Sequence, residues 1–256
     1  MRDRPLPAWT AYVARCLAEG VLDWRSGLHR LVLQPLVYLL VFSGLLGGAA
    51  GLGDGGTART VAPGIVTIVV MNASLAVVGG MFTSGYYFRV MEAWLLGPIS
   101  LRGFVAAQVV GATLMAAVAG LAAMALVWLL LGFVPAAPIT AIAAIVFGGA
   151  AFALIFVIGF TLPRTPDRAQ EVLSFILMPM MFLGCTFYTW DSLAGGWRVV
   201  ALAMPTTYLS EALRAAYRAE SGLGGAAMAA GGAAVLMALA VLADLAFHRR
   251  FRDFPW

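Results

Sequence analysis

The side chains that could carry out covalent or metal chemistry are few in this chain and stand far apart. The only cysteines are Cys16 and Cys185, and the only histidines are His29 and His248. Their separation is not typical of a disulfide framework or a metal site, so we expect no metal and structural roles for all four. A membrane-embedded enzyme would need a cluster of His, Asp or Cys residues, which the sequence does not contain. We therefore predict no catalytic residue in this chain.

The basic residues narrow the chemistry further, because all 16 are arginine and there is no lysine. A phosphate-binding G-x-x-x-x-G-K-[ST] loop requires its lysine, and so does a lysine Schiff base. The chain therefore cannot hydrolyse ATP through such a loop, and we expect no cofactor in this chain. The arginines are scattered along the sequence, which favours a role in membrane orientation over binding of nucleic acid.

The composition indicates that these residues are held by helices in a lipid bilayer. Of the 256 residues, 62% are apolar and 11% are charged, whereas soluble domains carry about 25% charged residues. The mean hydropathy is +0.93. A helix of about 20 mostly apolar residues is long enough to cross a bilayer. Six stretches meet this requirement, which predicts an all-α polytopic membrane protein: residues 31–50, 61–82, 103–132, 139–162, 172–188 and 226–247.

The distribution of arginine predicts the orientation of these spans. If the N-terminus is inside, the outer segments contain only Arg59, Arg198, Arg214 and Arg218, and the other 12 of the 16 arginines are cytoplasmic. Because arginine and lysine accumulate on the cytoplasmic side of membrane proteins, both termini are expected in the cytoplasm.

The chain divides into a cytoplasmic N-terminal segment, residues 1–30, and a transmembrane domain, residues 31–256. In residues 9–28 the apolar side chains recur at steps of three and four residues, with Trp9 and Trp24 near the two ends. This pattern predicts an amphipathic helix that lies along the inner membrane surface. A soluble helix packed against a partner is the alternative.

Two connecting segments are long enough to form helices of their own. The cytoplasmic residues 84–102 predict a short helix that Gly97 and Pro98 end, with an ordinary connecting turn as the alternative. The outer residues 189–225 predict two short helices, residues 197–204 and 206–218, with Pro205 interrupting between them. Two such half-length helices can form a re-entrant pair if protein covers their backbone, whereas a surface hairpin is the alternative.

Asp244 is the only acidic residue inside a predicted span, and it lies one turn from His248 and Arg249. An acid this close to the inner interface is expected to pair with the arginines there. A proton-coupled secondary transporter would need ionisable groups near the membrane centre, so this alternative function has little support in the sequence.

The order of these segments resembles that of the permease subunits of type-2 ABC exporters. The cytoplasmic motif of that family is matched by Glu92, Leu95, Pro98, Ile99 and Ser100, although Gly97 stands where Ala or Thr is usual. The outer motif is matched by Gly184, Phe187, Tyr188, Pro205, Tyr208, Glu211, Leu213 and Arg214, although Thr189 replaces the usual proline. Residues 61–65 also resemble the start of the second span in many members.

The resemblance implies an exporter of hydrophobic or amphipathic substrates such as drugs, lipids, glycolipids or polysaccharides, in the inner (plasma) membrane of a prokaryote. It implies a coupling helix within residues 84–102 that contacts a separate ATP-binding subunit, which would carry ATP and magnesium. A second permease, identical or paralogous, and membrane lipids are the other expected partners. The candidate coupling residues are Arg89, Glu92, Leu95, Pro98 and Ser100. The candidate outer-gate residues are Phe187, Tyr188, Pro205, Tyr208, Glu211 and Arg214.

Overall fold

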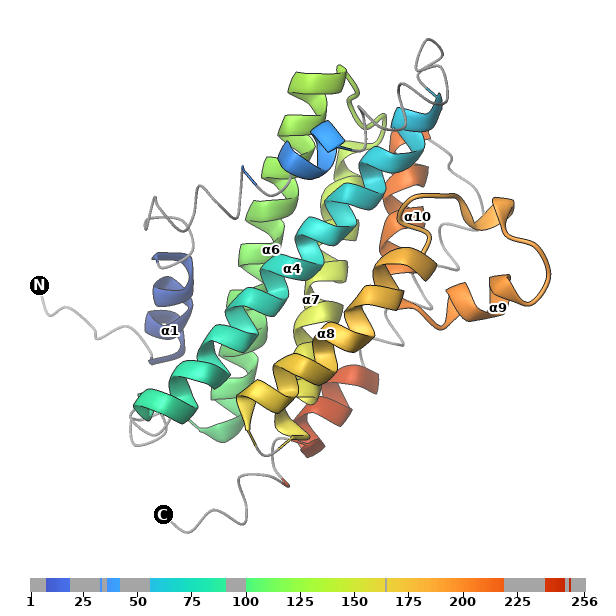
Figure 1. The fold of residues 1–256 in the computed structure, drawn as a ribbon. Coiled ribbons are helices and arrows are strands. Elements are labelled where there is room, and N and C mark those ends of the chain that lie inside the picture. The colour runs from blue at the N-terminus through green and yellow to red at the C-terminus, as the bar shows by residue number, and fades with distance from the viewer. Residues whose placement is uncertain are drawn as a thin grey trace, which may run out of the picture.

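The computed structural model describes residues 8–18, 33, 36–41, 56–90, 100–163, 165–218, 238–246 and 249. Every named element in these residues is a helix, which agrees with the predicted all-α class. The α-helices are α1 (Ala8–Leu17), α4 (Gly56–Phe88), α6 (Leu101–Leu131), α7 (Pro138–Thr161), α8 (Pro166–Leu183), α9 (Trp197–Leu202) and α10 (Pro205–Arg218), and a 3-10 helix, η4, covers Trp190–Ser192. The long helices form one bundle, from which α9 projects to one side (Figure 1).

Three helices of the described part are long and apolar enough to cross a membrane: Thr60–Phe88, Arg102–Leu131 and Pro138–Thr161. They confirm the second, third and fourth predicted spans. Helix α4 has 33 residues, which at 1.5 Å per residue gives about 50 Å, so it extends beyond a hydrocarbon core of about 30 Å. It continues to Phe88, six residues past the predicted end of its span.

The first, fifth and sixth predicted spans remain predictions. Residues 31–50 and 226–247 lie largely outside the described residues. The fifth predicted span, residues 172–188, overlaps α8, but α8 begins at Pro166 and ends at Leu183. Its first two turns carry Asp167, Arg168 and Glu171, so that α8 is less apolar than the three clear spans.

Local sequence signals explain where the long helices begin and end. Ser100 caps α6 by accepting a hydrogen bond from the backbone N–H of Gly103 at 3.1 Å. Gly132 ends α6 with φ +71°, a left-handed conformation that favours glycine. Pro138 is the first residue of α7, where its missing N–H costs nothing. Within α6, and after Pro138 in α7, the sequence is largely apolar and free of proline. These two helices therefore satisfy their own backbone groups in lipid.

The core of the bundle lies where α4, α6 and α7 meet. Val66, Val70 and Met71 of α4 are fully buried. Small residues allow the helices to approach closely: Ser74 of α4 donates a hydrogen bond to the carbonyl of Gly149 in α7 at 3.2 Å. By contrast, Leu129 and Ile139 are 75% and 83% exposed. Large apolar side chains on the outside of the bundle suit a surface that faces lipid.

The amphipathic N-terminal helix is present as α1, which covers the first half of predicted residues 9–28 and packs against α6. Residues 19–32 lie outside the described part of the chain. Trp9 is 50% exposed, whereas Tyr12 is buried and its ring lies 5.4 Å from that of Phe104. The apolar stripe of this helix therefore includes a contact with protein.

The predicted pair of outer helices is found, with one correction. Pro205 does not interrupt between them but is the first residue of α10, and the first helix, α9, ends at Leu202 rather than at Met204. Proline fits the first turn of a helix because the N–H that it lacks would have no partner there.

Candidate functional site

Helix α10 is the element that brings the outer-gate residues together. Its buried side chains are Thr206, Thr207, Leu209, Ser210, Leu213, Arg214 and Ala216. They face α7 and α4, the helices with which α10 makes most of its contacts. Gly148 of α7 makes room for Leu209, since a Cβ there would lie 2.5 Å from a Leu209 methyl carbon. Helix α10 is thus covered by protein on one side, as a helix of polar character near a membrane requires.

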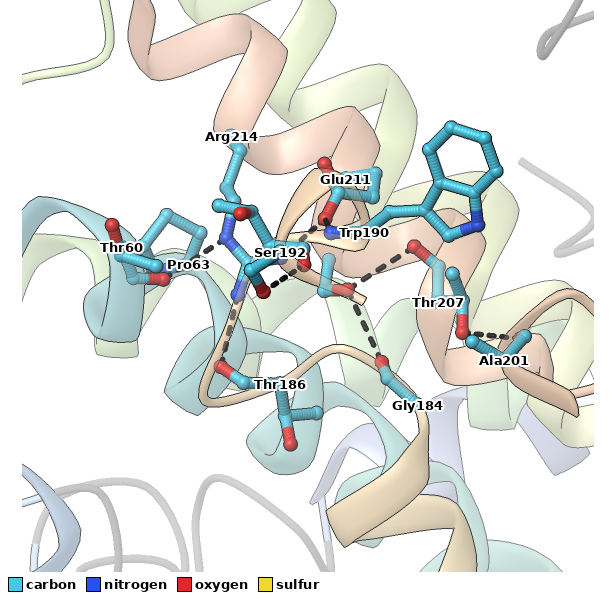
Figure 2. Close-up of polar contacts among 12 residues, drawn as sticks. Thr60, Pro63, Gly184, Thr186, Trp190, Ser192, Ala201, Thr207, Glu211 and Arg214 are labelled. Carbon is cyan, nitrogen blue, oxygen red and sulfur yellow. Dashed lines mark hydrogen bonds and ion pairs between the residues drawn. The ribbon is translucent and has the colours of Figure 1, made fainter. Parts of the chain in front are cut away.

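Arg214 is a buried charged side chain, with 2% of its side-chain surface exposed. Its Nη1 donates to Glu211 Oε1 at 2.7 Å, Nε donates to the carbonyl of Thr60 at 3.0 Å, and Nη2 donates to the carbonyl of Thr186 at 3.1 Å. Figure 2 shows the guanidinium at the point where these segments meet. Arg214 therefore joins α10 to the start of α4 and to the segment that follows α8.

Glu211 compensates the buried charge and holds a further segment. Its side chain is 18% exposed, and Oε1 also accepts a hydrogen bond from the backbone N–H of Trp190 at 2.9 Å. Burial lowers the pKa of Arg214 below its usual value, whereas the neighbouring carboxylate of Glu211 raises it. Because arginine keeps its proton in proteins, the carboxylate pairs with a charge that has lost most of its contact with water.

Hydroxyl groups on α10 fasten the ends of two more helices. Thr206 donates to the carbonyl of Met180 in α8 at 2.9 Å, and Ser210 lies 3.3 Å from the carbonyl of Gly184. Thr207 donates to the carbonyl of Ala201 in α9 at 2.6 Å. The carbonyl of Met180 also accepts from the backbone N–H of Gly184, and that of Ala201 from the N–H of Met204, so these hydroxyls add a second hydrogen bond at the ends of α8 and α9.

Two glycines allow the backbone segments of this region to touch. A Cβ on Gly64 of α4 would lie 1.6 Å from the carbonyl oxygen of Thr186, and one on Gly184 would lie 1.7 Å from Oγ1 of Thr206. No side chain of any size fits these positions. The close approach places the segment after α8 directly on the helix backbone of α4.

The other predicted gate residues lie in the same region but make local contacts. Tyr188 donates to the carbonyl of Phe182 at 2.8 Å, and Tyr208 donates to that of Leu202 at 2.7 Å. The ring of Phe187 lies 5.9 Å from that of Phe182. Pro205 begins α10. The structure thus brings the six predicted residues to one end of the bundle, where Glu211 and Arg214 form the contacts between segments.

Sequence reasoning missed the backbone partners of Arg214. The acceptors in Thr60 and Thr186 are backbone carbonyls, which any residue could supply and no motif marks. The hydroxyls of Thr206, Thr207 and Ser210 could have been found, because Ser and Thr gather in the first turns of a helix that begins at Pro205.

At the opposite end of the bundle, the structure describes the borders of the candidate coupling segment. Arg89 directly follows α4 with φ +53°, and Ser100 directly precedes α6 as its cap. Glu92, Leu95 and Pro98 lie outside the described residues. The candidate coupling residues are therefore bracketed by the ends of two core helices.

Three polar contacts tie elements together toward this end. The Tyr87 hydroxyl of α4 donates to Asp167 Oδ2 of α8. The Tyr12 hydroxyl of α1 donates to Oε1 of Gln108 in α6. Arg102 Nε lies 3.5 Å from Asp244 Oδ2, so this acid has a partner at the start of α6 that the sequence did not suggest. The contact joins the described part of the last predicted span to the third.

The arrangement holds and joins segments of the described part of the chain. Among the described residues there is no group of three His, Cys, Asp or Glu side chains that could hold a metal ion. Glu211 and Arg214 form hydrogen bonds that join separate segments of the chain. Such a network can keep one end of a bundle closed and release it when its hydrogen bonds break.

Known proteins are similar to this chain over most of its length. A family model described as ABC-2 type transporter matches residues 7–217. The chain is 22% identical over 192 residues to the inner membrane transport permease YadH of Escherichia coli (strain K12), an alignment that covers 75% of each protein. The permease of the same name from Shigella flexneri matches with the same identity and coverage.

Proposed function

The chain belongs to the ABC-2 type transporter family, and from this premise we propose that it is the permease subunit of an ATP-driven exporter in an inner membrane. Its substrate is a hydrophobic or amphipathic molecule, such as a drug, a lipid, a glycolipid or a polysaccharide, which it moves out of the cytoplasm. The observation that carries the proposal is the buried Arg214–Glu211 pair, which ties three segments together at one end of an apolar bundle. A gate needs a closing contact of this kind.

The energy for export comes from a separate ATP-binding subunit. With no lysine in the chain, a phosphate-binding loop of the usual type is impossible. Residues 84–102 contact that subunit, because they connect the ends of α4 and α6, the two helices that form much of the core. ATP and magnesium bind to the partner subunit.

The chain crosses the membrane six times with both termini in the cytoplasm. Helix α1 lies at the inner interface, where the half-exposed Trp9 suits the headgroup region. Helices α9 and α10 enter the outer leaflet and return. The burial of one face of α10 supports this, and so do the exposed apolar side chains of α9, such as Val199 at 70%.

A second permease, identical or paralogous, faces α8. The exposed side of this helix carries Glu171 and Ser174 near its start and Phe175, Met178 and Phe182 further along. Carboxylates are costly against lipid, whereas a protein interface with water along part of its length accepts both kinds of side chain. The two permeases together enclose the path of the substrate.

Co-purification tests the assignment of the partner. The permease is expected to retain an ATP-binding subunit, and the complex is expected to hydrolyse ATP. A charge at Leu95, as in Leu95→Asp, should leave the permease folded and uncouple ATP hydrolysis from transport. Leu162→Asp is the matched control, since Leu162 is an exposed apolar residue at the end of α7, outside the coupling segment.

The direction of transport is tested with inside-out vesicles that contain the complex. With ATP present they should accumulate a fluorescent amphipathic dye, and the Leu95→Asp vesicles should not. Normal ATP-driven accumulation by Leu95→Asp vesicles would show that the coupling segment is assigned wrongly. A permease that binds no ATPase would overturn the proposed function.

A further inference from the structure

Helices α4 and α8 run in opposite directions and are tied to each other at both ends. At one end, the Tyr87 hydroxyl donates to the carboxylate of Asp167. At the other end, Arg214 donates to the carbonyl of Thr60 in α4 and to the carbonyl of Thr186, three residues past the end of α8. Figure 1 shows these two helices side by side in front of α7.

From this double attachment we propose that Tyr87 and Asp167 are a positioning pair, which makes α8 follow the cytoplasmic end of α4 and so keeps the outer network around Arg214 closed. The inference deepens the proposed function and rests on it, because it assigns a role in gating. Tyr87 is two residues from Arg89, where the candidate coupling segment leaves α4. A displacement of that segment therefore reaches α8 through this hydrogen bond.

The pair is well placed for this task. Tyr87 is on the last turn of α4, and Asp167 is in the first turn of α8, where a negative charge also stabilises the helix N-terminus. The buried residues of α8 include Ala169, Leu173 and Leu177, and the helix packs against both α4 and α7. Leu173 faces α7, since a Cβ on Gly159 would lie 2.7 Å from one of its methyl carbons. Helix α4 makes far more extensive contacts with α6 and α7 than with α8. The two end contacts therefore supplement a limited packing contact between α4 and α8.

The chain supplies its own reporter and its own control. Cys185 lies between Gly184 and Thr186 in the outer segment and is fully buried. Cys16 is the only other cysteine, so a Cys16→Ser background leaves a single thiol behind the outer network. Tyr86 precedes Tyr87 and is equally exposed, at 52% and 53%. Its hydroxyl has no hydrogen-bond partner among the described residues, which makes Tyr86→Phe the matched control.

The experiment measures how fast a membrane-impermeant maleimide labels Cys185 in intact cells, with the full chain in its membrane. Tyr87→Phe and Asp167→Ala are expected to raise the labelling rate about two- to five-fold, the range that loss of one hydrogen bond allows. Asp167→Asn keeps an acceptor oxygen and should stay near the parent rate, as should Tyr86→Phe. Unfolding in detergent should change little in all four variants, because the Tyr87–Asp167 hydrogen bond is exposed to solvent.

Equal rates for Tyr87→Phe and Tyr86→Phe would overturn the proposal. A higher labelling rate of Cys185 together with a matching loss of stability in detergent would also overturn the proposal. That result would indicate that the whole protein has become less stable. This readout needs neither substrate nor ATP-binding subunit, so its failure is distinct from a failure of the co-purification that tests the proposed function. Ser192→Cys in a cysteine-free background marks the outside, and its failure to react would overturn the outward placement of the gate.

Discussion

Removal of the carboxylate of Glu211 should open the outer network and destabilise the protein. In Glu211→Ala, Arg214 keeps its two carbonyl acceptors but loses the carboxylate with which it forms an ion pair, while its side chain remains largely shielded from water. Breaking a buried ion pair by removing one partner costs about 3–5 kcal/mol. Because Glu211 is itself 18% exposed and the carbonyls still accept, we expect the lower part of this range, about 3 kcal/mol.

Glu211→Gln separates the effect of charge from that of shape. The amide oxygen can still accept from the Trp190 N–H and from Arg214, so mainly the strength of charge-assisted hydrogen bonds is lost. Bonds to charged groups contribute about 1.5–3 kcal/mol and neutral bonds about 0.5–1.5 kcal/mol. The expected loss for Glu211→Gln is therefore about 1–2 kcal/mol, clearly smaller than that for Glu211→Ala.

The free energy of unfolding is measured by denaturant titration in detergent micelles, and gate opening by labelling of Cys185 from outside. Asp191→Asn is the control, because Asp191 is an exposed acid in the same outer region and only its backbone carbonyl accepts from Arg198. It should change stability by no more than about 0.5 kcal/mol. If both Glu211 variants lose less than about 1 kcal/mol, the pair behaves as an exposed surface pair and the reasoning is wrong.

Three further predictions concern the described helices. Gly64→Ala should abolish accumulation of folded protein, since its Cβ would lie 1.6 Å from a backbone oxygen. Its control, Gly80→Ala, has nothing within 4 Å of the added Cβ and should leave stability unchanged or raise it by up to about 1 kcal/mol. Equal membrane yields of the two variants would contradict the close approach at Gly64. Tyr12→Phe should lower the free energy of unfolding by about 1–3 kcal/mol, because the buried oxygen of Gln108 loses its donor; an unchanged value in the same titration would show that α1 is held by apolar contacts alone. Tyr217→Phe should leave stability unchanged or raise it, because the Tyr217 hydroxyl is buried with no hydrogen-bond partner in the described part of the chain; a loss above about 1 kcal/mol would reveal a partner for it.

Features that depend on local pattern were predicted well. The spans of α4, α6 and α7 follow from long apolar runs, since no other secondary structure satisfies the backbone of a segment surrounded by lipid. The two outer helices follow from a short apolar run and the proline after it. Only their exact ends differed, because the sequence does not tell whether a proline breaks a helix or begins one.

The partners of the polar side chains depended on the tertiary structure. The i, i+3 spacing of Glu211 and Arg214 makes them neighbours on a helix, but Arg214 also donates to the carbonyl of Thr60, more than 150 residues away. Asp244 pairs with Arg102 because its segment, residues 238–246, reaches the start of α6. Tyr87 and Asp167 meet for the same kind of reason, across 80 residues of chain.

The sequence by itself determined the membrane class, the family resemblance and the helices, because hydrophobic runs, proline and the missing lysine act locally or through composition. Only the tertiary structure decided which charge is sheltered and which segments it joins. The acceptors of Arg214 are backbone carbonyls, which every residue carries, so their identity is set by how the helices pack. The sequence motif identifies the hydrogen-bond donor, Arg214. Its backbone acceptors can be identified only from the folded structure, because they belong to segments that are distant in the sequence.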